Sequence, residues 1–387
     1  MLSKEQKFTI SGKIRARAAG VPFRGTPGRL NSITDLPGVS VGYSTIIKGG
    51  GVLKVGEGPV RTGVTAIIPR VIESNVANGV FAGSFTLNGN GEMSGLPWVE
   101  ETGRLQGPIT LTNTHSVGIV RDTVIKWMNS KTNNEEADGN SFWMPLTGET
   151  CDNWLNDMNG FHVKEDHVFH AINNASDGPI EEGSVGGGTG MSCYQYKGGT
   201  GTSSRLVEIN NKKFTVGALV QANFGLRDCL TIAGVPVGKY LPYEEEESKK
   251  GSNFEDERGS IVAIIGTDAP LMPHQLKRLA KRAGLGIALS GGIAANSSGD
   301  FFVAFSTANK QAFGNTSGIE KLEFLGEFST SELFQATIQA VDEGIINALY
   351  CNETMIGRDY NRRCALPVKE VTELLKRYNR WNGINNL

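Results

Sequence analysis

The sequence predicts a single α/β domain in which helices are layered on mixed β-sheets. Three observations support this class. Strand-like apolar runs alternate with glycine turns along most of the chain, two later segments have helical periodicity, and no linker divides the sequence apart from one charged insertion. With 387 residues, 39% of them hydrophobic and 20% charged, the chain has the composition of a globular protein with a substantial core.

The predicted strands form two series and one final strand. The first series contains the runs 39–47, 63–71, 79–87 and 107–120, and the second contains 192–209, 213–225 and 260–268. The final apolar run, Phe301–Thr307, follows a loop of small residues, 291–300. The chain has 50 glycines, nearly twice the average usage, which indicates many tight turns between these strands.

Two weak helix candidates interrupt the first series, at Arg121–Ser130 and Cys151–Asn159. A better-marked helix is predicted over His274–Leu289, where apolar residues fall on one face and Pro273 suits the first turn.

The clearest helical periodicity covers Glu332–Tyr350, and Ser329 with Glu332 forms a plausible capping box. At the N-terminus, residues 1–30 are basic and predict an extended arm or a short helix. The charge run Tyr243–Ser260 predicts a solvated loop insertion.

Charge and hydropathy argue against several partners. The formal net charge is −2 and no basic stripe is present, so we expect no nucleic-acid partner. No run of eighteen apolar residues exists and the N-terminal segment lacks a signal-peptide core, so we expect a soluble, cytoplasmic protein that does not bind membranes.

Cysteine and histidine usage argues against a metal site. The five cysteines are widely spaced without a CxxC motif, which favours reduced thiols over disulfides or zinc. The five histidines form no HExxH motif, and His167 and His170 lack further ligands nearby. We therefore expect neither a metal nor an organic cofactor.

Two glycine-rich segments leave alternatives open. The segment 183–205 lacks both the Walker A pattern and the dinucleotide fingerprint, so it is either a set of turns between strands or a lining for a small-molecule site. The segment 88–101, with the sequence NGNGEMSGLPWVEE, is either a structural turn or the rim of an active site.

The loop before Phe301 suits a particular chemistry. A serine hydroxyl is a weak nucleophile unless a base lies beside it. If the chain is cut just before a serine, the new α-amine, with a pKa of about 7.7–8.0, can act as that base. The same composition, NSSGD, also occurs in ordinary turns, and no GxSxG elbow is present to support the α/β-hydrolase alternative.

Many collinear motifs carry a family resemblance, among them ITDLPGVSVG, LNGNGEMSG, LTNTHSVGIVRD, GSVGGGTGM, VQANFG and SSGDFFVAFSTAN. From about Asn31 onward the chain resembles the DmpA-type aminopeptidases, which include L-aminopeptidase/D-esterases and β-peptidyl aminopeptidases. The resemblance implies a four-layer αββα sandwich of the N-terminal-nucleophile hydrolase kind. It also implies that one domain, 1–387, cuts itself into chains 1–297 and 298–387.

The resemblance assigns roles to individual residues. Ser298, which precedes Gly-Asp, corresponds to the nucleophile, so the scissile bond is Ser297–Ser298, with Ser297 as the neighbouring alternative. Asn223 resembles the oxyanion-site asparagine. Tyr194 resembles the active-site tyrosine, and Tyr196 is close enough to be the true equivalent.

Two further roles follow from the same resemblance. Glu182 corresponds to the carboxylate that holds the free amine of the substrate, and its alternative is a solvated loop acid beside Glu181. Thr337 and Gln339 stand where some relatives have a hydroxyl and a carboxylate near the nucleophile, although glutamine cannot act as a base.

The expected function is that of a self-processing N-terminal-serine aminopeptidase, which forms an acyl-enzyme with short peptides, amino-acid amides or esters. The resemblance implies a homo-oligomer, specifically a tetramer of processed units. The alternative from another class is an unprocessed, non-catalytic binding or scaffold protein on the same fold.

Overall fold

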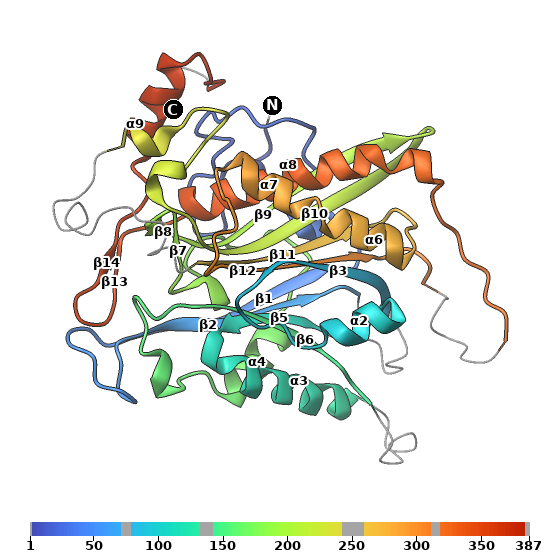
Figure 1. The fold of residues 1–387 in the computed structure, drawn as a ribbon, viewed down its shortest axis with the longest axis horizontal. Helices are drawn as coiled ribbons and strands as arrows, with labels where there is room; N and C mark the ends of the chain where they lie inside the picture. The colour runs from blue at the N-terminus through green and yellow to red at the C-terminus, as the bar shows by residue number, and fades with distance from the viewer. Residues whose placement is uncertain (1, 71–78, 132–141, 242–258, 311–317, 384–387) are drawn as a thin grey trace.

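The computed structural model describes residues 2–70, 79–131, 142–241, 259–310 and 318–383. Two β-sheets pack face to face, and helices cover both outer faces, which gives the four layers that the family resemblance implies (Figure 1). The six-stranded sheet has the order β4 (Arg104–Leu105), β3 (Val80–Gly89), β12 (Gly299–Ser306), β11 (Ser260–Thr267), β10 (Lys212–Asn223) and β9 (Gly199–Ile209). The four-stranded sheet has the order β1 (Ser40–Lys48), β2 (Val60–Ile68), β5 (Ile109–Asn113) and β6 (Leu146–Thr150).

The outer layers consist of helices that the chain contributes at different points. The six-stranded sheet is covered by α6 (Pro273–Ala280), α7 (Ala283–Leu289) and α8 (Ser331–Tyr350), and the four-stranded sheet by α3 (Val117–Lys131) and α4 (Glu165–Asn173) (Figure 1). Shorter or peripheral helices are α1 (Lys4–Lys7), α2 (Leu96–Thr102) and α9 (Val368–Arg377), and two small ribbons pair β7 (Ser192–Cys193) with β8 (Tyr196–Lys197) and β13 (Met355–Ile356) with β14 (Arg362–Arg363).

The layers form because successive strand residues point to opposite faces. In β12, Phe302 packs in the apolar cluster beneath α6–α8, whereas Phe301 and Val303 pack in the cluster between the two sheets. Both faces of the central strands are therefore buried, which explains why the sequence of β12 is apolar nearly throughout.

Strand register brings residues distant in sequence to one end of the six-stranded sheet. Gly299, the first residue of β12, pairs with Ser260 of the parallel strand β11, and Ser260 pairs with Asn223 at the end of β10. On the other side of β12, Gly299 pairs with Gly89 at the end of β3. The loops that follow β3 and β10 therefore meet the loop that precedes β12.

Most predicted strands agree with the structure, but the run 107–120 is a strand only over Ile109–Asn113, because α3 begins at Val117. Three helix predictions also need correction. Cys151–Asn159 is not an α-helix, because its backbone bonds elsewhere: Asn156 Oδ1 accepts from Arg61 N and Asp157 N donates to Pro59 O. The His274–Leu289 helix is interrupted between Ala280 and Ala283 and forms α6 and α7.

The predicted capping box before α8 is also wrong. Thr330, rather than Ser329, occupies the N-cap, and its hydroxyl donates to Glu327 O instead of capping the helix. Pro273 begins α6 as predicted. The charge run Tyr243–Ser260 lies outside the described residues, except for its last two positions, 259 and 260.

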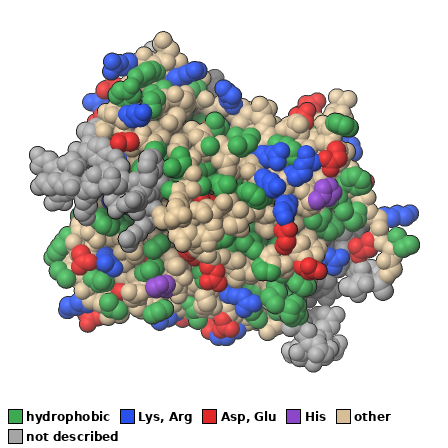
Figure 2. Space-filling model, viewed as in Figure 1, with side chains coloured by type: hydrophobic (Ala, Val, Ile, Leu, Met, Phe, Trp, Pro, Cys, Tyr) green, Lys and Arg blue, Asp and Glu red, His purple; other side chains and the backbone are tan. Residues whose placement is uncertain are grey.

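The N-terminal arm contains α1 and several turns, and it contacts α8 and β9, where Ala16 N donates to Asn347 Oδ1 and Leu206 N donates to Thr26 O. Within the described ranges, no helix has the length and hydropathy to cross a bilayer. Figure 2 shows charged side chains of both signs spread over one face of the molecule, with a group of Lys and Arg beside a histidine. This mixed distribution agrees with the absence of a basic stripe in the sequence.

Candidate active site

Ser298 lies immediately before β12 and is only 1% exposed. Its hydroxyl donates a 2.7 Å hydrogen bond to Oδ1 of Asp300, which is also buried. The structure describes the uncut chain, in which Ser298 is still joined to Ser297. In this state the Ser298 hydroxyl already has a carboxylate that can accept its proton.

The peptide bond between Ser297 and Ser298 is fixed from both sides. Its N–H, on Ser298, donates to Ala295 O at 2.8 Å, and its carbonyl, on Ser297, accepts a 2.5 Å bond from Asn90 Nδ2. Asn88 Nδ2 donates to Ala295 O at 2.7 Å and to Asn296 O at 3.3 Å. The end of β3 therefore holds the loop in a defined conformation.

A second buried carboxylate, Glu149, belongs to the four-stranded sheet, whereas Ser298 precedes a strand of the six-stranded sheet. It is 3% exposed at the end of β6, where it accepts from the hydroxyl of Thr114 and, at 3.0 Å, from Glu92 N. Burial raises the pKa of Glu149, and these two hydrogen bonds only partly oppose the shift. In the part of the chain that the structure describes, Glu149 forms no ion pair.

The turn after β3 connects Glu149 to the Ser298 loop by close contact. A Cβ on Gly91 would lie 2.6 Å from Glu149 Oε1, and a Cβ on Gly299 would lie 2.7 Å from Asn90 O. Both contacts are possible only because these residues are glycines. The motif NGNGE and the Gly of Ser-Gly-Asp thus belong to one site, which supports the active-site-rim interpretation of 88–101.

Asn223 is aligned with Gly299 across the sheet, because both residues pair with Ser260 on the strand between them. Two strand spacings correspond to about 10 Å between the backbones of Asn223 and Gly299. Its side chain points between the sheets, where Nδ2 donates to Cys151 O at 3.0 Å and Oδ1 accepts from Ser192 N at 2.8 Å. The structure therefore places Asn223 at the same end of the sheet as Ser298, with its amide bonded to backbone groups.

Tyr194 lies on the other face of the six-stranded sheet. It is fully buried in the cluster under the helices, and its hydroxyl bonds to Ser290 Oγ at 2.9 Å. Burial raises the pKa of Tyr194 well above 10, so the phenol stays neutral. Tyr196 belongs to the same cluster, with the guanidinium of Arg227 over its ring. The structure places neither tyrosine with Glu149 and Asn90.

Glu182 is buried in a different part of the molecule, outside the edge strand β9. Its carboxylate forms a 2.6 Å ion pair with Arg15 Nε and accepts from Thr202 N at 2.9 Å. Thr202 is aligned across the sheet with Val303, which lies four residues along β12 from Gly299. The strand β9 is also three strands away from β12, so Glu182 lies far from Ser298. The local sequence allowed an amine-binding role, but the fold uses this carboxylate to hold the N-terminal arm.

Thr337 lies far from Ser298 as well. Its hydroxyl donates to Leu333 O within α8, and the following turn of α8 contacts β9, where Ser203 Oγ donates to Ala340 O. Ser203 shares a row with Ala304, which is five residues, or about 16 Å, along β12 from Gly299. Gln339 lies on the same helix, and its backbone carbonyl accepts from Arg205.

The glycine-rich segment 183–205 joins the two sheets instead of lining the site. Gly186 N donates to Thr45 Oγ1 and Gly187 N donates to Thr65 Oγ1, both at about 3 Å. Because these backbone donors are used inside the protein, the segment is better explained as turns between strands than as a ligand cradle.

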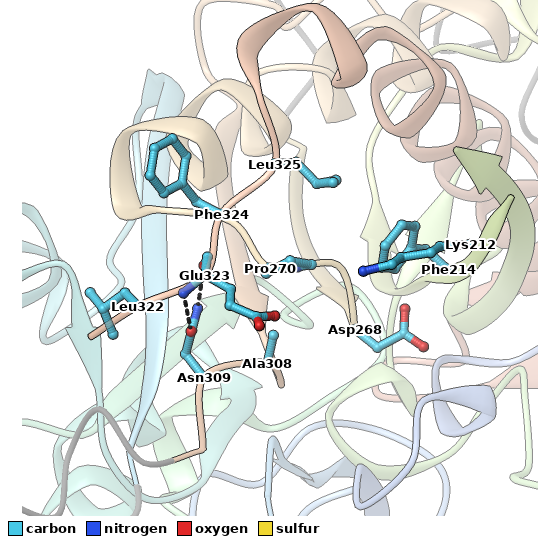
Figure 3. Close-up of a pocket in the computed structure, with 10 residues that line it drawn as sticks. All are labelled: Lys212, Phe214, Asp268, Pro270, Ala308, Asn309, Leu322, Glu323, Phe324 and Leu325. Carbon is cyan, nitrogen blue, oxygen red and sulfur yellow. Dashed lines mark hydrogen bonds between the residues drawn. The ribbon is translucent and has the colours of Figure 1, made fainter. Parts of the chain in front are cut away.

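A pocket of about 560 Å³ lies at the opposite end of the sheet, near the beginning of β10 and after the end of β12 (Figure 3). In this pocket Asp268 Oδ1 accepts a hydrogen bond from Thr215 N. Asn309 forms two hydrogen bonds with the backbone of Glu323. It contains neither the nucleophile candidate nor the carboxylates of the Ser298 end. We therefore place the chemistry at Ser298 in spite of the size of this pocket.

No group of three His, Cys, Asp or Glu side chains in the described ranges has a metal-binding arrangement. The chemistry available at the Ser298 end is that of a hydroxyl, two carboxylates and side-chain amides. This set suits acyl transfer, in which a hydroxyl attacks a carbonyl and amides stabilise the oxyanion.

Solved structures that are similar to this chain define its class. The L-aminopeptidase D-Ala-esterase/amidase from Ochrobactrum anthropi, described as a prototype serine aminopeptidase with a variant of the N-terminal-nucleophile hydrolase fold, has a TM-score of 0.87 at 41% identity and covers 95% of this chain and 99% of that one. The PH0078 protein from Pyrococcus horikoshii OT3 has a TM-score of 0.87 at 45% identity, with 94% and 99% coverage. The expected N-terminal-nucleophile fold is confirmed.

Sequence similarity then defines the family. Residues 31–363 match peptidase family S58, to which this chain belongs. The beta-peptidyl aminopeptidase BapA of Sphingosinicella microcystinivorans is 46% identical over 377 residues, which are 95% of this chain and 93% of that protein. The chain is therefore an aminopeptidase-family hydrolase, and the resemblance to the DmpA-type enzymes is confirmed.

Proposed function

We propose that this chain is a self-processing N-terminal-serine aminopeptidase whose Ser297–Ser298 bond is cut to give chains 1–297 and 298–387. The observation that carries the proposal is the buried Ser298 hydroxyl, bonded to Asp300 at the beginning of β12, beside a peptide bond held on both sides. After cutting, the free amine of Ser298 serves as the base for its own hydroxyl.

Glu149 is the proposed acceptor for the free amine of the substrate. A buried carboxylate without a cationic partner is costly, and a substrate ammonium would supply the missing charge. Glu149 is also linked to the Ser298 loop through Glu92 and Gly91. This assignment replaces Glu182, whose carboxylate is already paired with Arg15.

Asn223 remains the proposed oxyanion donor during substrate turnover. Its side-chain amide is at the same sheet end and on the same face as Gly299. Its Nδ2 carries two N–H groups, and in the uncut chain it donates to Cys151 O at 3.0 Å and to Ser260 Oγ at 3.4 Å. To stabilise a substrate oxyanion, one of these two N–H groups has to turn to the substrate.

The proposed substrates are short peptides, amino-acid amides or esters with a free N-terminus. The names of the relatives support this class, since they include a beta-peptidyl aminopeptidase and an L-aminopeptidase with esterase and amidase activity. We also propose a tetramer of processed units, on the basis of the family resemblance, and a cytoplasmic location, on the basis of the sequence features described above.

The test is expression of the wild type, Ser297→Ala and Ser298→Ala proteins. We expect two fragments from the wild type, with Ser298 as the first residue of the smaller one in N-terminal sequencing. Ser297→Ala should still be cut at the same bond. Ser298→Ala should remain one inactive chain of 41.5 kDa. Cleavage of Ser298→Ala, or an intact wild-type chain with full activity, would refute the mechanism.

A further inference from the structure

The end of β3 and the turn that follows it each present one asparagine side chain to the loop before Ser298. Asn88 and Asn90 both donate through Nδ2 to loop carbonyls, but the carbonyls differ. Asn88 bonds to Ala295 and Asn296, which lie before the proposed scissile bond. Asn90 bonds to the carbonyl of Ser297, the group that is attacked when the chain is cut.

We infer that Asn90 is the catalytic oxyanion donor for cleavage of the chain itself, an inference that rests on the proposed function. When a hydroxyl attacks the Ser297 carbonyl, the negative charge develops on the oxygen to which Asn90 donates. A preformed donor at this position stabilises the transition state more than the ground state, since the charge is greater there. The 2.5 Å contact shows that no rearrangement of Asn90 is needed.

The other groups for the step are also present. The Ser298 hydroxyl donates to Asp300 Oδ1 at 2.7 Å, so Asp300 is the acceptor for its proton. The N–H of the scissile bond donates to Ala295 O, which also accepts from Asn88. Asn88 is therefore a positioning residue, whereas Asn90 contacts a reacting atom.

The cleavage step then proceeds as an acyl shift from nitrogen to oxygen. Ser298 Oγ forms a bond to the Ser297 carbonyl carbon and gives its proton to Asp300, and the oxyanion is held by Asn90. The C–N bond breaks, and the Ser298 nitrogen takes the proton from Asp300. Water then hydrolyses the resulting ester, which leaves a Ser297 carboxylate and a free Ser298 amine and hydroxyl. Asn90 is exposed to solvent, so water can reach this ester.

The backbone around Asn90 holds the amide in place. Gly91 N donates to Gly89 O at 2.9 Å, and Glu92 N donates to Glu149 Oε1 at 3.0 Å. The Asn90 backbone also packs directly on Gly299. The backbone is thus held both before and after Asn90, which fixes the position of the side-chain donor, as preorganised electrostatic stabilisation requires.

The experiment measures the rate at which newly synthesised full-length chain becomes the two fragments, followed by gel electrophoresis over time. Asn90→Asp keeps the side-chain shape but removes the donor, and Asn90→Ala removes the whole group. We expect both variants to be cut on the order of 10²–10³-fold more slowly than the wild type, which is the usual loss for one oxyanion donor. Circular dichroism checks that each variant folds.

Asn88→Ala is the matched comparison, since it removes two hydrogen bonds to the same loop but none to the Ser297 carbonyl. If Asn90 only holds the loop, Asn88→Ala should slow cleavage at least as much as Asn90→Ala, because Asn88 makes two hydrogen bonds to the same loop. That result overturns the inference. Cleavage of Ser298→Ala would refute the proposed function as well as this inference. Cleavage of Asn90→Asp at the wild-type rate would refute only the role of Asn90 and would leave the proposed self-processing at Ser298 unaffected.

Discussion

Two buried glutamates, Glu149 and Glu343, lie in different layers and have opposite surroundings. Glu343, on α8, is fully buried and receives guanidinium nitrogens of Arg17 and Arg205 at 2.5–3.0 Å, together with Asn31 Nδ2 at 2.7 Å. Glu149 accepts from the Thr114 hydroxyl and from a backbone N–H, and among the described residues it forms no ion pair. The described part of the chain therefore pairs one buried carboxylate with two arginines and leaves the other without an ion-pair partner.

The difference is visible in the pKa values. Burial raises the pKa of both groups, but at Glu343 the charges of Arg205 and Arg17 outweigh burial and lower the pKa to about 2. At Glu149 burial dominates, and the pKa is raised above its ordinary value of 4.5. A buried carboxylate that is satisfied by its own chain serves stability, whereas one that lacks a cation is a candidate for binding one.

The largest effect is expected for Glu343→Gln, which would remove the carboxylate that pairs with the half-buried Arg17 and the buried Arg205. We expect a loss of about 3–5 kcal/mol in the free energy of unfolding, as for other broken buried pairs. Urea denaturation should be measured in a Ser298→Ala background, so that the protein remains a single chain. A loss below about 1 kcal/mol would show that the arginines are solvated instead.

The pH dependence of this effect has a definite sign. Because the pKa of Glu343 is lower in the folded protein, its contribution is present above pH 4.5 and is lost as the pH falls towards about 2. The shift corresponds to about 3 kcal/mol. The stability difference between the wild type and Glu343→Gln should therefore shrink over this range of pH.

Glu149→Gln is expected to act on catalysis. Removing the carboxylate that pairs with the substrate ammonium should lower kcat/KM on the order of 10²-fold, the usual cost of truncating one partner of a buried charge pair. An aminoacyl p-nitroanilide serves as the substrate. Glu182→Gln is the control: among folded molecules it should keep kcat/KM near the wild-type value, because its carboxylate contacts Arg15. The reverse pattern would restore Glu182 as the amine site.

The pH profile of kcat/KM provides a second measurement on Glu149. The Ser298 amine, with an ordinary pKa of about 7.7–8.0, must be unprotonated to act as a base, so log kcat/KM should fall with slope 1 below that pH. Below the raised pKa of Glu149 the carboxylate also becomes protonated, and the slope should increase to 2. In Glu149→Gln the slope should stay at 1.

The smallest effect is expected for Thr337→Val. Its hydroxyl donates to Leu333 O within α8, at the far end of β12 from Ser298. The substitution keeps the side-chain shape, and we expect less than a twofold change in kcat and in the rate of chain cleavage. A loss of 10²-fold or more would show that Thr337 has the role that the family resemblance implies.

Local patterns were sufficient for much of the fold. The alternation of apolar runs and glycine turns predicted all the long strands of the six-stranded sheet and the strands β1, β2 and β5. Periodicity predicted α8, and the weaker candidate Arg121–Ser130 falls within α3. The same kind of local evidence failed at Cys151–Asn159, because contacts with Arg61 and Pro59 compete with helical bonds. It also missed α4 and α9, and the short strand β6 that carries Glu149.

The sequence by itself determined the α/β class and the motif that carries Ser298, since a serine between a small-residue loop and an apolar strand is a local feature. Only the tertiary structure decided which polar groups surround that serine. Asn90 meets Ser297 across 207 residues, and Glu149 meets Glu92 across 57. Glu182 is instead neutralised by Arg15, 167 residues away. The charge state and partners of a carboxylate depend on contacts between distant segments, which strand register and layer packing fix and which no local pattern contains.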